Sequence, residues 1–158
     1  VAMGVVALVG AAVADGAATP GAWVATWMVA AGLAFALAVG FMWAKARAAG
    51  ESLLSGPGRK FAWSVSPPLL VGGLLTLALA GTPAWGLLPG IWLLLYGAGI
   101  LGGGSFSVRV IPLMGLTFMA LGAVALFAPA GMGDFFMAAG FGGLHILFGL
   151  VIWRKHGG

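Results

Sequence analysis

His145 is the one readily titratable side chain that lies deep inside an apolar segment of this sequence. A neutral imidazole in such a place can contact a proton or a substrate, or ligate a metal, haem or the magnesium of chlorophyll. The alternative is a histidine that only hydrogen-bonds between helices. No second His or carboxylate lies three or four residues away, which argues against a metal site made by protein ligands alone.

Trp92, Tyr96 and Thr117 also carry polar groups inside apolar segments. They are suited either to line an interior cavity or to hydrogen-bond between packed helices. The sequence has no GxSxG or HExxH motif, no paired carboxylates and no lysine placed for a Schiff base. We therefore expect no catalytic residues and no enzyme.

The composition identifies the solvent of this chain as lipid. Of its 158 residues 62% are hydrophobic and 6% are charged, whereas soluble domains carry about 25% charged residues. A net charge of +4 comes without the aromatic–basic clusters that bind nucleic acid, so we expect no nucleic-acid partner. The absence of cysteine excludes disulfides and thiolate-ligated cofactors.

Six apolar segments follow one another, separated by Gly- and Pro-rich turns that end helices. They span Val1–Ala14, about Pro20–Ala46, Phe61–Ala80, Trp85–Leu101, Val110–Phe127 and Phe135–Trp153. Because backbone polar groups in lipid need internal partners, each segment is expected to be α-helical. This predicts an all-α, polytopic membrane protein with a single transmembrane domain, residues 1–158. The first segment would give about 21 Å of helix, less than a ~30 Å hydrocarbon core, so we expect the first helix to begin before Val1.

The basic residues indicate the orientation. With a cytoplasmic N-terminus and six crossings, every basic residue falls on the cytoplasmic side: Lys45, Arg47, Arg59, Lys60, Arg109, Arg154 and Lys155. Asp15 and Asp134 fall on the opposite side. The positive-inside rule therefore predicts an N-in, C-in protein of a bacterial inner membrane. A phosphate-binding loop is excluded, because five residues separate Gly50 from Gly56 and Phe61 follows the Arg-Lys pair.

Glycines recur on the faces of several apolar segments. Three pairs are each seven residues, or two helical turns, apart: Gly90 and Gly97, Gly115 and Gly122, Gly142 and Gly149. Gly99 and Gly103 form a GxxxG pair. Small residues let helix backbones approach closely in lipid, so these faces are expected to pack within the bundle, with self-association as an alternative.

Tryptophans and prolines mark the predicted helix ends. Trp23 and Trp85 are expected at outer ends, where an indole can lie among headgroups, and Trp43, Trp63 and Trp153 at inner ends. Asp15 and Asp134 are expected to face water in equivalent turns. The stretch "SVSPPLL" is expected to bend or delay the start of the third helix.

Three stretches read alike: "VAMGVVALVGAAVAD", "SPPLLVGGLLTLALAG" and "VIPLMGLTFMALGAVALFAP". They predict three tandem hairpins, at about residues 1–46, 61–104 and 110–154. The stretch "MGLTFMALGAVALFAPAGMGDFFMAAGFGGLHILFGLVI" resembles the repeat of the HdeD-type six-helix membrane proteins. The resemblance implies three hairpins and, by analogy with enteric bacteria, a role in acid or envelope stress, and it supplies no catalytic residues.

These observations favour a non-catalytic packing or interaction module, whose partners are the lipid bilayer and either a second copy or a larger membrane complex. The alternative is a small transporter or channel for a proton-linked or apolar solute, with His145, Trp92 and Tyr96 along its path. A third is a haem- or chlorophyll-binding subunit using His145; otherwise no cofactor is expected. A filled core favours the first hypothesis, and a polar-lined cavity reaching mid-membrane favours the second.

Overall fold

The computed structural model describes residues 1–48, 50, 52, 56–105, 107–129 and 131–156. All regular elements in these ranges are helices, so the predicted all-α class is confirmed. The α-helices are α1 (Ala2–Ala14), α2 (Pro20–Ala48), α3 (Gly56–Leu79), α4 (Leu88–Gly104), α5 (Val110–Phe127), α6 (Gly133–Met137) and α7 (His145–His156). A 3₁₀ helix, η1 (Pro83–Leu87), precedes α4, and a π-helical segment, η2 (Ala138–Leu144), joins α6 to α7.

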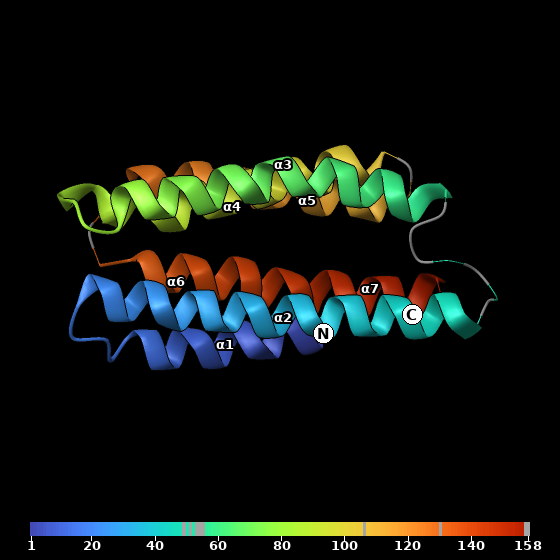
Figure 1. The fold of residues 1–158 in the computed structure, drawn as a ribbon, viewed down its shortest axis with the longest axis horizontal. Helices are drawn as coiled ribbons and strands as arrows, with labels where there is room; N and C mark the ends of the chain where they lie inside the picture. Colours follow the sequence, from blue (N-terminus) through green and yellow to red (C-terminus); the bar gives the residue numbers. More distant parts are fainter. Residues whose placement is uncertain (49, 51, 53–55, 106, 130, 157–158) are drawn as a thin grey trace.

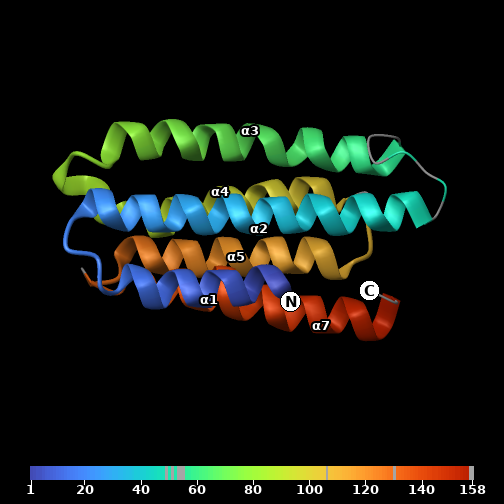
Figure 2. The same cartoon turned by 60° about the horizontal axis from the view of Figure 1, so that its bottom comes forward.

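The helices form two layers of three (Figures 1 and 2). One layer holds α5, α4 and α3, with α4 in the middle and in contact with both neighbours. The other holds the continuous α6–η2–α7 rod, α1 and α2, with α1 in the middle. The central helices α1 and α4 therefore present residues to the space between the layers.

Five helical stretches in the described residues are long and apolar enough to cross a membrane, and α1 is a shorter apolar helix of 13 residues. Large apolar side chains cover the outside of the bundle; Leu77 is 83% and Phe127 is 90% exposed. Exposed apolar surface of this extent needs an apolar solvent or a partner. The helices thus have the character of a multi-pass membrane protein.

Two predicted helix starts were wrong. The third helix begins at Gly56 and continues through Pro67 and Pro68, so the proline pair lies inside α3 and does not delay its start. The fourth helix begins at Leu88, because Thr82 accepts a hydrogen bond from the backbone of Ala84 and starts the 3₁₀ turn before it.

Glycines allow close packing between helices of this chain. A methyl group at Gly90 would lie 3.0 Å from the carbonyl oxygen of Gly122, and one at Gly4 would lie 2.6 Å from that of Gly142. Gly103 faces the ring of Phe61. The remaining glycines of the predicted faces also lie close to other segments of the chain. Gly97 and Gly115 meet between α4 and α5. Gly99 faces Val65 and Pro68 of α3, and Gly149 faces Val1.

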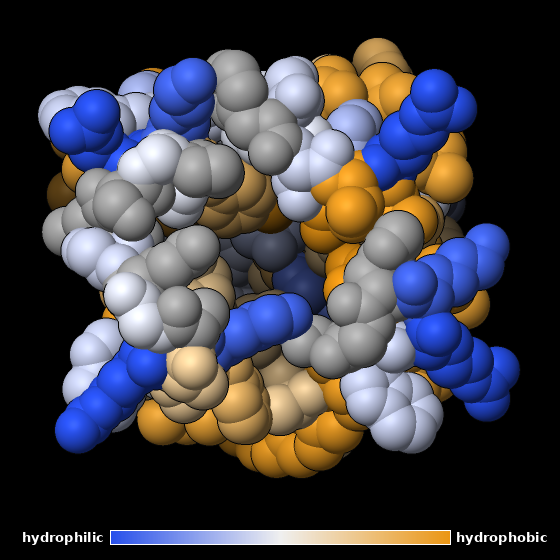
Figure 3. Space-filling model, turned by 90° about the vertical axis from the view of Figure 1, so that its right-hand side faces the viewer, coloured by the Kyte–Doolittle hydropathy of each residue, from blue (hydrophilic) through white to orange (hydrophobic). Residues whose placement is uncertain are grey.

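The two ends of the bundle differ in charge. We call basic end the one that holds the α2–α3 and α4–α5 connections and the C-terminal end of α7, because all seven Lys and Arg lie in or next to these segments. The opposite, acidic end holds the other three connections, with Asp15 and Asp134. Hydrophilic side chains gather around the basic end, and the centre of this face is hollowed (Figure 3).

The half of α2 that lies nearest the basic end is consistent with this hollow. None of the residues 31–48, all of them described, is buried. Trp27 and Ala30 are buried on one face of α2. The next residues along the same face, Ala34 and Ala38, are small. This part of α2 therefore leaves room between the layers.

Candidate functional site

Tyr96 and His145 meet between the two layers at mid-depth. The Tyr96 hydroxyl lies 2.7 Å from Nε2 of His145. Tyr96 is the middle residue of α4, and His145 is next to the midpoint of the apolar stretch Gly133–Lys155. The structure thus joins two of the three residues that the sequence suggested for an intramembrane site.

The π-helical segment sets the tautomer of His145. The backbone N–H of His145 bonds to the carbonyl of Gly142, and Nδ1 of its ring lies 3.0 Å from the carbonyl oxygen of Phe141. Because a carbonyl oxygen only accepts, Nδ1 carries the proton, and Nε2 of the neutral imidazole accepts from Tyr96. Widened turns of this kind are frequent at functional sites.

Aromatic rings enclose the pair. Phe118 is fully buried, with its ring centroid 4.9 Å from that of Tyr96 and 5.3 Å from that of His145. The ring of Phe141 is nearly parallel to the imidazole. This apolar surround leaves the Tyr96–His145 hydrogen bond little competition from other polar groups.

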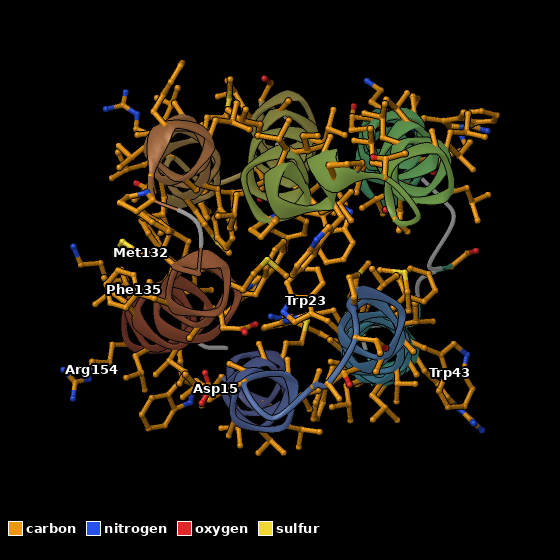
Figure 4. All side chains as sticks on the ribbon, turned by 90° about the vertical axis from the view of Figure 1, so that its left-hand side faces the viewer. Asp15, Trp23, Trp43, Met132, Phe135 and Arg154 are labelled. Atoms are coloured by element: carbon orange, nitrogen blue, oxygen red, sulfur yellow. The ribbon has the colours of Figure 1, made fainter. Side chains whose placement is uncertain are left out.

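A second polar site lies toward the acidic end, where Asp134 accepts two indole hydrogen bonds. The Nε1 atoms of Trp23 and Trp27 lie 2.7 and 3.0 Å from the same oxygen, Oδ1. Donors to a carboxylate make stronger bonds than donors to neutral groups. Asp134 therefore links the α6–η2–α7 rod to α2, at the end where Figure 4 shows Trp23 directed into the bundle.

Four indoles pack together beside this carboxylate; we call Trp23, Trp27, Trp85 and Trp92 the tryptophan cluster. The ring of Trp23 is stacked on that of Trp92, with centroids 5.5 Å apart and planes at 12°. Its edge contacts Trp85 and its plane is tilted against Trp27. The cluster connects α2, η1 and α4 across the space between the layers.

Trp92 is further held by Thr76. Its Nε1 donates to Thr76 Oγ1 at 2.8 Å, and that hydroxyl donates to the carbonyl of Gly72. Trp92 and Tyr96 are one helical turn apart on α4, so polar groups follow one another from the acidic end to mid-depth. Both side chains are half-buried.

The remaining predicted residues divide into two groups. Thr117 bonds to the carbonyl of Leu113 in its own helix and does not join the site. Asp15, Trp43, Trp63 and Trp153 are exposed, as expected for helix ends.

Two expectations need correction. Trp23 is 5% exposed and packs inside the bundle, so it does not lie among headgroups. Asp134 is half-buried under two indoles, so it does not simply face water. Sequence reasoning missed both contacts, and also the buried Thr76.

Cofactor ligation at His145 meets a geometric obstacle. Both ring nitrogens are engaged, one by Phe141 and the other by Tyr96. If Nε2 were to hold the metal of haem or chlorophyll, the Tyr96 hydroxyl would have to give up its place there. Among the described residues, no three His, Cys, Asp or Glu side chains come together to hold a metal ion.

No family model matches this chain, and neither the curated proteins nor the solved structures include a match to it.

Proposed function

We propose that this chain is a six-span protein of a bacterial inner membrane, made of three helical hairpins with both ends in the cytoplasm. The gathering of all seven basic residues at one end of the bundle supports this orientation, because cytoplasmic segments retain Lys and Arg. We also propose that the chain shares the three-hairpin architecture of the HdeD-type membrane proteins.

We further propose that the protein is a small, non-enzymatic transporter or channel that moves protons across the membrane through the space between its two layers. The single observation that carries this proposal is the 2.7 Å contact between the Tyr96 hydroxyl and His145 Nε2 at mid-depth. An imidazole can accept and release a proton, and a phenol hydroxyl hydrogen-bonded to it can pass one on. The hollowed basic end supports access from that side.

The glycine contacts favour this role over that of an interaction module. A module that associates through its glycine faces would turn them toward other proteins. In this chain Gly90, Gly97, Gly115 and Gly142 meet other helices of the same chain. The packing of these residues is therefore accounted for without a partner.

Proton entry into proteoliposomes tests the proposal. Vesicles loaded with a pH-sensitive dye are given a membrane potential with potassium and valinomycin, and acidification of the lumen is followed. We expect proton entry with the natural protein, entry close to that of protein-free vesicles with His145→Ala, and a reduced rate with Tyr96→Phe.

Thr117→Ala is the matched control, because that hydroxyl bonds only within its own helix. Circular dichroism and size-exclusion chromatography check that each variant folds. Undiminished proton entry with a folded His145→Ala protein, or none above protein-free vesicles with the natural chain, would contradict the proposal.

A further inference from the structure

We infer that Asp134 and the tryptophan cluster form a binding site for an organic cation, such as a quaternary ammonium or phosphonium ion with apolar substituents. The inference rests on the proposed transport function in one respect, since it names the class of solute that would travel with the protons. Binding itself can be measured without transport, so the two proposals can fail separately.

The charge of Asp134 favours a cation as the ligand. Both indole hydrogen bonds to Asp134 end on Oδ1, so they leave Oδ2 available to a ligand. Asp134 is half-buried, and all seven Lys and Arg lie toward the other end of the bundle. The carboxylate thus has hydrogen-bond donors in the protein but no basic side chain at its own end to balance its charge.

The indoles of the tryptophan cluster also favour a cation. The face of an indole is electron-rich and attracts a cation, most strongly where water is excluded. Trp23 is buried with Trp92 stacked on it, while Trp85 and Trp92 keep accessible surface on the same cluster. A ligand that reaches Oδ2 therefore meets aromatic surface.

The same features select against other ligands. Hard metal ions take six or more oxygen ligands, and among the described residues no three His, Cys, Asp or Glu side chains come together at Asp134 or elsewhere. An anion would be repelled by the carboxylate. A neutral apolar molecule could contact the indoles but would gain nothing from the charge.

Equilibrium binding of tetraphenylphosphonium to the full chain in lipid nanodiscs tests the inference. We expect saturable binding above that of protein-free nanodiscs, weakened about tenfold or more by Asp134→Asn. The asparagine oxygen can still accept from both indoles, so the substitution removes the charge and keeps the hydrogen bonds. Asp15→Asn is the matched control, because it removes the exposed carboxylate of the same end, and we expect it to bind as the natural chain does.

Two further measurements keep the test decisive. Triphenylphosphine oxide has a similar shape and no net charge, and it should not displace tetraphenylphosphonium from the natural chain. Trp92→Phe should weaken binding by removing part of the aromatic surface. Absence of saturable binding, equal affinity in folded Asp134→Asn, or displacement by the neutral analogue at similar concentration would each overturn the inference, and the last does not depend on any variant.

Discussion

Gly97 of α4 and Gly115 of α5 face each other so closely that a methyl group on Gly97 would lie 2.7 Å from the carbonyl oxygen of Gly115. Both are buried, and backbone atoms cannot move aside as the end of a flexible side chain can. The α4–α5 interface therefore depends on the absence of side chains at this point.

Gly97→Ala should accordingly destabilise the bundle. Overpacking costs about 1–3 kcal/mol, which more than offsets the better helix propensity of alanine. Gly32→Ala provides the control, since nothing lies within 4 Å of a methyl group there. Thermal unfolding in one detergent, followed by circular dichroism, should give a lower midpoint for Gly97→Ala and an unchanged or higher one for Gly32→Ala. Equal midpoints would show that the two helices are not packed as described.

Tyr96→Phe should change the state of the His145 ring. Without the hydroxyl, Nε2 loses its donor while Nδ1 keeps Phe141. The ¹⁵N chemical shift of Nε2 should move in the direction of a free acceptor nitrogen, with Nδ1 still protonated. Hydrogen bonds between membrane helices average about 0.6 kcal/mol, so only a small loss of stability is expected. The measurement uses a His156→Gln background to leave one histidine signal, and an unchanged Nε2 shift would argue against the hydrogen bond.

Thr76→Val should loosen Trp92. Valine matches the shape of threonine but offers no oxygen to the indole N–H, which leaves a half-buried donor without its partner. We expect a loss of about 1 kcal/mol in the free energy of unfolding. Thr76→Ser keeps the hydroxyl and should retain most of that stability. If Thr76→Val and Thr76→Ser have the same free energy of unfolding, the hydroxyl contributes nothing to stability at this position.

Single cysteines should report the proposed orientation. The chain contains no cysteine, so Ser107→Cys in the α4–α5 connection and Ala18→Cys in the α1–α2 connection each introduce one label site. Both positions are exposed. A membrane-impermeant maleimide added to intact cells should label Ala18→Cys, and Ser107→Cys only after the cells are opened. Labelling of both from the same side would refute the orientation.

The hydrophobic pattern predicted the helices because the signal is local. Runs of apolar residues and the Gly-Pro turns between them are properties of neighbouring residues, and the predicted fifth segment, Val110–Phe127, coincides with α5. The start of α3 was missed because the third segment was drawn from the apolar run that begins at Phe61, whereas the helix extends back to Gly56. The prolines, expected to bend or delay the helix start, lie inside the helix. Once a helix is surrounded by lipid, interior prolines are tolerated more readily than in water.

The candidate site was only partly predictable. His145, Trp92 and Tyr96 stood out because polar groups are rare in apolar segments. Their partners did not, since Asp134 and Trp23 are 111 residues apart and no local pattern relates them. The π-helical turn before His145 depends equally on packing, because its sequence, AAGFGGL, carries no periodicity that separates it from an ordinary helix.

The prolines inside α3 have a mechanical consequence. Neither Pro67 nor Pro68 has a backbone N–H, so the carbonyls of Trp63 and Ser64 lose their usual donors four residues ahead. Two consecutive backbone hydrogen bonds are thus absent from α3 at the point where it packs against Gly99 of α4. Fewer backbone hydrogen bonds therefore resist bending between the segment from Gly56 to Ser66, which leads to the basic end, and the rest of α3.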